Sequence, residues 1–159
     1  MKNITTEIKW GMIFFSVTLL WMYFEKLMGW HGPNIEQHAT YTMLFAIPAI
    51  LVYVFALLDK RKNAYEGKMN WKQGFFTGLI ITLIVTVLSP LGQLIIHTII
   101  SPEYFPNVIE YAVEQDKMSR SEAESQFNLS SYIFQATFGA LVMGIVTSAI
   151  VALIVKKTK

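Results

Sequence analysis

The feature that most constrains this chain is a set of long apolar runs that take up most of its length. They lie at residues 8–30, 41–58, 73–100 and 130–155. A hydrocarbon core about 30 Å thick requires roughly 20 apolar residues in helical form. The composition agrees, because 53% of the residues are hydrophobic and only 15% are charged. We therefore predict an all-α integral membrane protein built as a bundle of four transmembrane helices.

The polar stretches between the runs are too short to form a separate soluble domain, so we predict one domain over residues 1–159. The chain has no Cys, which excludes thiolate catalysis, disulfides and Cys-based metal sites. It also lacks a nucleophile elbow, an H-E-x-x-H motif and a phosphate-binding loop. We expect a protein that is not an enzyme, with no cofactor and no nucleic-acid partner.

Small side chains recur at every fourth residue in the last two runs, and on a helix such residues share one face. In lipid, where hydrophobic burial does not drive helices together, close approach across small residues is a main source of association. We therefore predict that the last two spans pack through these residues. In the third run they are Gly74 and Gly78, and in the fourth Ala136, Ala140, Gly144, Ser148 and Ala152.

Prolines and the polar segment 101–129 give further expectations. Pro48 and Pro90 each remove a backbone donor, so both spans should bend there. In segment 101–129 we expect an N-cap at Ser101, a turn that ends at Pro106, and two short amphipathic surface helices. The helices should cover residues 107–116 and 120–127, the second opened by a capping box that starts at Ser119.

The charges predict an orientation. Ten of the 13 Lys and Arg residues lie near the two termini or in residues 59–72, whereas eight of the 11 acidic residues lie toward the other side. Because basic residues stay in the cytoplasm, we predict a multi-pass protein of a bacterial inner membrane with both termini cytoplasmic.

Polar residues inside membrane spans are the default candidates for a functional site. Glu25, Gln93, His97 and Gln135 fall at similar depths near the outer ends of three spans, and they could line a shared proton-responsive or headgroup-binding pocket. In the alternative interpretation, Glu25 reaches the interface and the amides satisfy one another within the bundle. We expect no metal site, because the spacing of His31, Glu36, His38 and His97 matches no established ligand pattern.

Four segments together resemble a known family. They are residues 67–78, 100–104, 119–124 and 144–157. The set is similar to a family of small four-span inner-membrane proteins, mostly from Bacteroidetes, that is catalogued as domain of unknown function 4199. The resemblance covers nearly the whole chain and carries no established site residues. It implies a membrane-bound polyprenyl-phosphate glycosyltransferase, or its lipid-linked sugar, as a partner.

Two functions remain open at this point. The first is a non-enzymatic accessory or scaffold subunit of an inner-membrane assembly, which contacts the lipid bilayer and another membrane protein. The alternative is a small transporter or flippase-like protein that uses the bends at Pro48 and Pro90 together with an outward-facing polar pocket. Four spans would form a transport pathway as a homodimer.

Overall fold

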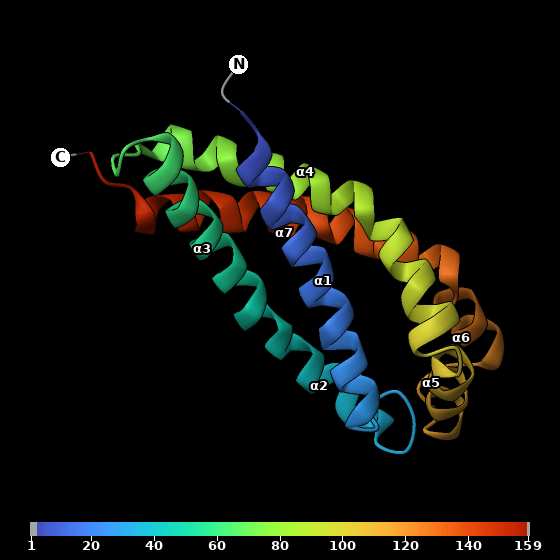
Figure 1. Cartoon of the computed structure of the whole chain (residues 1–159). Coiled ribbons are helices and arrows are strands. Elements are labelled where there is room, and N and C mark those ends of the chain that lie inside the picture. The colour runs from blue at the N-terminus through green and yellow to red at the C-terminus, as the bar shows by residue number, and fades with distance from the viewer. Residues whose placement is uncertain (1–2, 159) are drawn as a thin grey trace.

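A computed structural model describes residues 3–158, which fold into helices joined by short links (Figure 1). No strand occurs among these residues, although Met69 and Lys157 form one isolated antiparallel bridge. The elements are α1 (Thr5–Leu27), the 3-10 helix η1 (Ile35–Gln37), α2 (His38–Tyr41), the 3-10 helix η2 (Thr42–Phe45), α3 (Ala46–Ala64), α4 (Trp71–Ile95), the π-helix η3 (Ile96–Ile100), α5 (Tyr104–Glu114), α6 (Arg120–Gln126) and α7 (Leu129–Val155).

Three helical segments are long and apolar enough to cross a membrane: Ile35–Ala64, Trp71–Ile100 and Leu129–Val155. Their apolar side chains face outward to a large extent, as Val87, Phe134 and Ile154 illustrate. These helices make the chain a multi-pass membrane protein. Helix α1 has 23 residues and charged side chains in its first and last turns, and it is not among the three.

The helix expected at residues 41–58 is longer at both ends, because helical turns begin at Ile35 and α3 continues to Ala64. Pro48 lies in the first turn of α3, directly after the 3-10 turn η2. Pro48 has no N–H group, so it cannot donate a hydrogen bond to the carbonyl of Leu44. The change from 3-10 to α geometry at this point therefore breaks no backbone hydrogen bond.

Pro90 lies inside α4, and the helix continues through it. In Figure 1 the helix changes direction where its colour passes from green to yellow. Five residues beyond Pro90, the α-helix passes into the π-helix η3, which carries His97. π-Helical turns widen the backbone spiral and are frequent at functional sites.

Helices α4 and α7 pack against each other more extensively than any other pair in residues 3–158. A Cβ atom added at Gly78 would lie 2.5 Å from Ser148 Oγ, and one added at Gly144 would overlap the side chain of Thr82. At Gly74 the added atom would lie 3.1 Å from Ala152 Cβ. The small residues of each helix therefore receive the side chains of the other.

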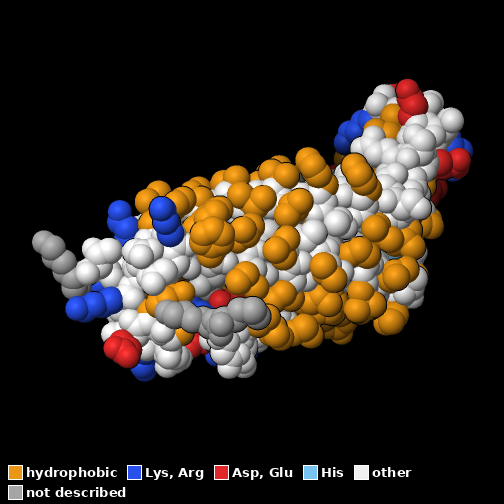
Figure 2. Space-filling model, turned by 90° about the horizontal axis from the view of Figure 1, so that it is seen from above, with side chains coloured by type: hydrophobic (Ala, Val, Ile, Leu, Met, Phe, Trp, Pro, Cys, Tyr) orange, Lys and Arg blue, Asp and Glu red, His pale blue; other side chains and the backbone are white. Residues whose placement is uncertain are grey.

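The surface divides into an apolar band and two polar ends. Figure 2 shows hydrophobic side chains over the middle of the molecule and Lys and Arg gathered at the end that carries the termini. We call this the terminal end. The opposite end, called the far end, holds α2, α5 and α6, and its protruding part carries both acidic and basic side chains (Figures 1 and 2). This distribution is that of a protein with a lipid-facing belt.

The segment between η3 and α7 differs from the expectation in its first turns. Ser101 does not cap a helix, because α5 begins at Tyr104 with no side-chain cap, and Pro106 lies inside the first turn of α5 rather than ending a turn. A proline is tolerated there because the first helical N–H groups need no partner within the helix. The capping box at Ser119 is confirmed, since Ser119 and Glu122 bond reciprocally at the start of α6.

Candidate functional site

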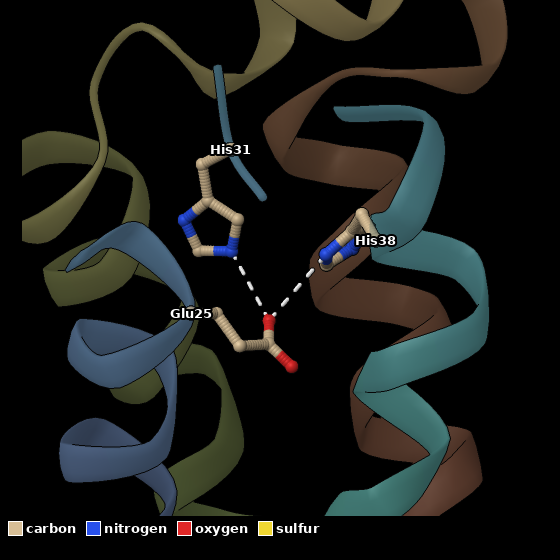
Figure 3. Close-up of side chains that lie close together, drawn as sticks. All are labelled: Glu25, His31 and His38. Atoms are coloured by element: carbon tan, nitrogen blue, oxygen red, sulfur yellow. Dashed lines mark hydrogen bonds and ion pairs between the residues drawn. The ribbon is translucent and has the colours of Figure 1, made fainter. Parts of the chain in front are cut away.

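The most constrained polar group in the apolar part of the protein is Glu25, in the last turns of α1. Its side chain has no exposed surface. The indole N–H of Trp21, one turn earlier, donates to Oε1. His31 Nε2 lies 3.1 Å from Oε2, and His38 Nδ1 lies 3.4 Å from the same oxygen. Figure 3 shows the carboxylate between the two imidazoles, which come from different elements. We call Glu25, His31 and His38 the imidazole–carboxylate cluster.

The chain brings His31 back toward Glu25 through the C-terminal cap of α1. Gly29 has a φ of 78°, which a residue with a side chain rarely adopts. The N–H of Gly29 donates to Lys26 O and that of Trp30 donates to Glu25 O, which is the pattern of a Schellman motif. Trp30 is buried and stacks on Tyr41 with ring centroids 4.7 Å apart. The cap and this stacking together fix the direction in which His31 leaves the helix.

His31 is held on its other side by the segment after η3. Its Nδ1 lies 2.9 Å from Ser101 Oγ, and its carbonyl accepts a hydrogen bond of 2.8 Å from Asn107 Nδ2. His31 and Ser101 are both buried. Ser101, His31 and Glu25 are hydrogen-bonded in the order hydroxyl, imidazole, carboxylate, as in a catalytic triad with a serine nucleophile. Ser101, however, has no exposed surface that an acyl substrate could reach. Ser101 therefore orients the imidazole.

His38 occupies the first position of α2, and 18% of its side chain is exposed. Its Nδ1 makes no hydrogen bond despite lying near Glu25 Oε2, because the geometry of the approach is poor. Its ring lies 5.2 Å from that of His31 and 5.2 Å from that of Tyr104. His38 therefore forms the more accessible wall of the cluster.

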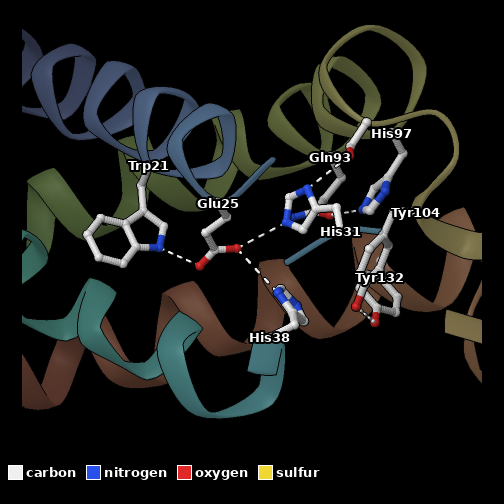
Figure 4. Close-up of polar contacts among 9 residues, drawn as sticks. Trp21, Glu25, His31, His38, Gln93, His97, Tyr104 and Tyr132 are labelled. Atoms are coloured by element: carbon white, nitrogen blue, oxygen red, sulfur yellow. Dashed lines mark hydrogen bonds and ion pairs between the residues drawn. The ribbon is translucent and has the colours of Figure 1, made fainter. Parts of the chain in front are cut away.

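A second polar group lies beside the cluster (Figure 4). His97 Nε2 is 3.1 Å from Gln93 Oε1, and its ring stacks on Phe105 at 4.1 Å. Tyr104 bonds to Tyr132 through their hydroxyls at 3.0 Å, and its ring contacts those of His31 and His97. Burial raises the pKa of the Tyr104 hydroxyl above its ordinary value, so this group stays neutral.

The structure thus divides the four residues that the sequence placed in one pocket. Glu25 contacts His31 and His38, Gln93 pairs with His97, and Gln135 is exposed near the start of α7. Of the four residues considered for a metal site, His31 and His38 come together, whereas Glu36 is exposed and His97 belongs to the second group. The approach of His31 and His38 to Glu25 was missed, because it depends on the fold of the loop.

A cavity of about 450 Å³ lies between α1, α3, α4 and α7. Aromatic and aliphatic side chains form most of its wall, including Phe14, Phe45 and Met143. Three of the small residues of α7 also border the cavity: Ala136, Ala140 and Gly144. Gln93 of α4 borders it as well. The cavity belongs to the apolar middle of the bundle, and Gln93, which pairs with His97, lies at its border.

These features define a class: a multi-pass helical membrane protein with an imidazole–carboxylate cluster at its far end and an apolar cavity between α1, α3, α4 and α7. The chain belongs to the family described as protein of unknown function DUF4199, whose model matches residues 9–157. No curated protein and no solved structure matches it.

Proposed function

We propose that this chain is a four-span protein of a bacterial inner membrane, with both termini in the cytoplasm, that holds the hydrocarbon chain of a lipid in the cavity between α1, α3, α4 and α7. In this proposal it is a non-enzymatic accessory subunit of a membrane assembly. The observation that carries the proposal is the cavity, whose volume of about 450 Å³ falls within the range of ligand pockets.

The chemistry of the wall selects a hydrocarbon. Two of the hydroxyls that border the cavity are already satisfied, since Thr18 bonds to the carbonyl of Phe14 and Tyr53 bonds to Thr82. Gln93 is paired with His97. Among the described residues no charged side chain lines the cavity, and the polar side chains that remain there are the small hydroxyls of Thr42, Ser89 and Thr147. Because transfer of a lipid tail from bilayer to cavity exchanges one apolar medium for another, shape and van der Waals contact would determine which chain binds.

The fourth span in this proposal is α1. Its 23 residues correspond to a length of about 35 Å, enough for the hydrocarbon core. Its charges lie at its ends and have partners: Glu7 binds Lys60 at 2.8 Å, and Lys26 lies 3.4 Å from Glu103. With α1 as a span, the basic terminal end faces the cytoplasm as the positive-inside rule requires.

The role as an accessory subunit rests on the sequence resemblance and on the packing surface. The resemblance implies a polyprenyl-phosphate glycosyltransferase as a partner, and a cavity lined with apolar groups suits an isoprenoid chain. Alternatively, the cavity serves as part of a flippase-like path, because the 3-10 turn η2 before Pro48 and the π-helix η3 after Pro90 both border it. Interrupted helices are common at transporter binding sites.

The cavity can be tested by filling it. Gly139 borders the cavity, and a Cβ added there meets no atom within 4 Å. Gly139→Leu should therefore occupy the cavity without disturbing α7. The matched control is Val142→Phe, which adds bulk to an exposed position of the same helix. The readout is native mass spectrometry of protein purified in mild detergent at native expression level, with bound lipids and co-purifying chains identified together.

We expect wild type and Val142→Phe to retain a lipid, and Gly139→Leu to lose it. Equal lipid retention by all three proteins would contradict the proposal. A second protein in stoichiometric amount would support the accessory role. A bare monomer or homodimer that moves fluorescent lipid between the leaflets of reconstituted vesicles would favour the flippase alternative.

A further inference from the structure

We propose that Glu25, His31 and His38 bind one divalent transition-metal ion, of which Zn²⁺ fits best, at the far end of the bundle. The inference is independent of the cavity and of any lipid bound there. It rests on the chemistry of the three ligands and on the distances between their donor atoms. It also rests on the hydrogen bonds made by the second oxygen of Glu25 and the second nitrogen of His31.

The donor set is that of a borderline metal. Two imidazole nitrogens and one carboxylate oxygen suit Zn²⁺, and they are less suited to Ca²⁺ and Mg²⁺, which prefer oxygen ligands. Each residue offers one donor atom, and the three donors all lie within 4.8 Å of one another. Three protein ligands would leave a fourth tetrahedral position for water or another donor.

The distances match those of a metal site. Bonds of about 2.0–2.1 Å in a tetrahedral arrangement place neighbouring donor atoms about 3.3 Å apart. His31 Nε2 and His38 Nδ1 lie 3.1 and 3.4 Å from Glu25 Oε2. An ion would therefore need little movement of the side chains to reach all three donors.

Electrostatics favours a cation at the same place. Glu25 and His31 are buried, and Lys26, which follows Glu25 in the chain, points instead toward the carbonyl of Ile100 and toward Glu103. Two nitrogens face the same carboxylate oxygen, and one of them, His38 Nδ1, makes no hydrogen bond. An unsatisfied buried nitrogen is unfavourable, and a bound metal would satisfy it together with the carboxylate.

The remaining atoms of the ligands are already oriented. Trp21 holds Oε1 of Glu25, which leaves Oε2 free to bind as a single donor. Ser101 lies 2.9 Å from His31 Nδ1. Its hydroxyl oxygen can accept a hydrogen bond from the Nδ1–H group, so that Nε2 presents its lone pair to the ion. Metal-binding histidines generally have such a partner on the second nitrogen.

The test uses the full chain in detergent, without a histidine tag, stripped of metal with a chelator and titrated with Zn²⁺ or Co²⁺. Co²⁺ reports its own geometry, because tetrahedral coordination gives strong visible absorption. The variants are His38→Ala, whose site is partly exposed and should tolerate the change, and Ser101→Ala. His97→Ala is the control, since it removes a nearby imidazole outside the cluster.

We expect one ion per chain, a tetrahedral Co²⁺ spectrum that Zn²⁺ displaces, and a loss of affinity of at least tenfold in His38→Ala. Ser101→Ala should weaken binding by about 10- to 100-fold, as loss of a second-shell partner does, and His97→Ala should bind as wild type does. Absence of stoichiometric binding by folded wild-type protein would overturn the proposal. Equal binding by wild type and His38→Ala would overturn it as well.

Discussion

Glu7 of α1 and Lys60 of α3 form a buried ion pair. Both residues are 2% exposed, and the ammonium group also donates to the carbonyl of Asn3 at 2.8 Å. Burial of each charge is unfavourable by itself, and the contact is tolerable only because the partners satisfy each other. The pair therefore fixes how the two helices meet at the terminal end.

Lys60→Met should destabilise the protein by about 3–5 kcal/mol, because it leaves Glu7 buried without a counter-charge. The measurement is the free energy of unfolding from titration with a denaturing detergent. Lys62→Met, at an exposed position of the same helix, is the control. The double variant Glu7→Gln with Lys60→Met should recover most of the loss. A double variant as unstable as Lys60→Met would show that packing of the Lys60 stem, and not its charge, matters here.

Also at the level of single residues, the sequence singled out Glu25 as a candidate for a polar pocket but did not identify the residues that contact it. Sequence spacing on straight helices suggested His97, whereas the structure places His31 and His38 beside the carboxylate. Glu25 lies in α1, His31 in the following loop and His38 in α2, so no single helical face relates the three residues. The one local signal was Gly29 followed by Trp30, which is typical of a helix cap that turns the chain back.

At the level of elements, the α4–α7 pair is held in one register by alternating small and larger side chains. Gly78 receives Ser148, and Thr82 fills the space left by Gly144. Thr82 and Ser148 also bond to the carbonyls of Gly78 and Gly144 and lie 3.3 Å from each other. Buried hydroxyls thus have partners within the interface, as apolar surroundings require.

Gly144→Ala should destabilise the protein by about 1–3 kcal/mol, because the added methyl group overlaps Thr82 and forces the helices apart. Gly139→Ala makes the same chemical change on the same helix where no atom lies within 4 Å. Thermal unfolding in detergent should therefore distinguish the two. If both variants were as stable as wild type, the interface would be more adaptable than its geometry implies.

The positions of the long helices were largely predictable, whereas their ends and the polar segments were not. Runs of apolar residues locate helices in a membrane protein well, because lipid requires satisfied backbone groups. The start at Ile35 was missed, since most of residues 36–40 are polar, and these turns are helical through their continuity with η2 and α3. Pro106 was misread because proline is compatible with both the end of a turn and the first turn of a helix.

At the level of the whole molecule, the arrangement of charges predicts which loops share one side of the membrane. The terminal end carries the described residues at both ends of the chain and the link 65–70, and the far end carries the imidazole–carboxylate cluster and α5 (Figure 1). If α1 spans the membrane, Asn3 and Glu66 lie on the same side. If α1 does not span, Asn3 lies on the side of α5.

The absence of native Cys permits a direct test with single cysteines and a membrane-impermeant maleimide. Glu114→Cys should be labelled in intact cells, whereas Asn3→Cys and Glu66→Cys should be labelled only after the inner membrane is opened. All three positions are exposed, so access to the side chain is not limited by burial. Labelling of Asn3→Cys together with Glu114→Cys in intact cells would contradict the four-span arrangement.

The bridge between Met69 and Lys157 joins the segment before α4 to the second residue after α7 by two backbone hydrogen bonds of 2.8 Å. Together with the interlocked small side chains, this bridge connects α4 and α7 along their length. A sliding or separation of the two helices would therefore break the backbone bridge and the side-chain contacts at the same time. They are the most extensively packed pair of helices in residues 3–158. If a lipid tail enters the cavity, as we propose, α4 and α7 should keep their register, and the movement should fall to α1 and α3 on the other sides of the cavity, away from the terminal end where Glu7 and Lys60 join them.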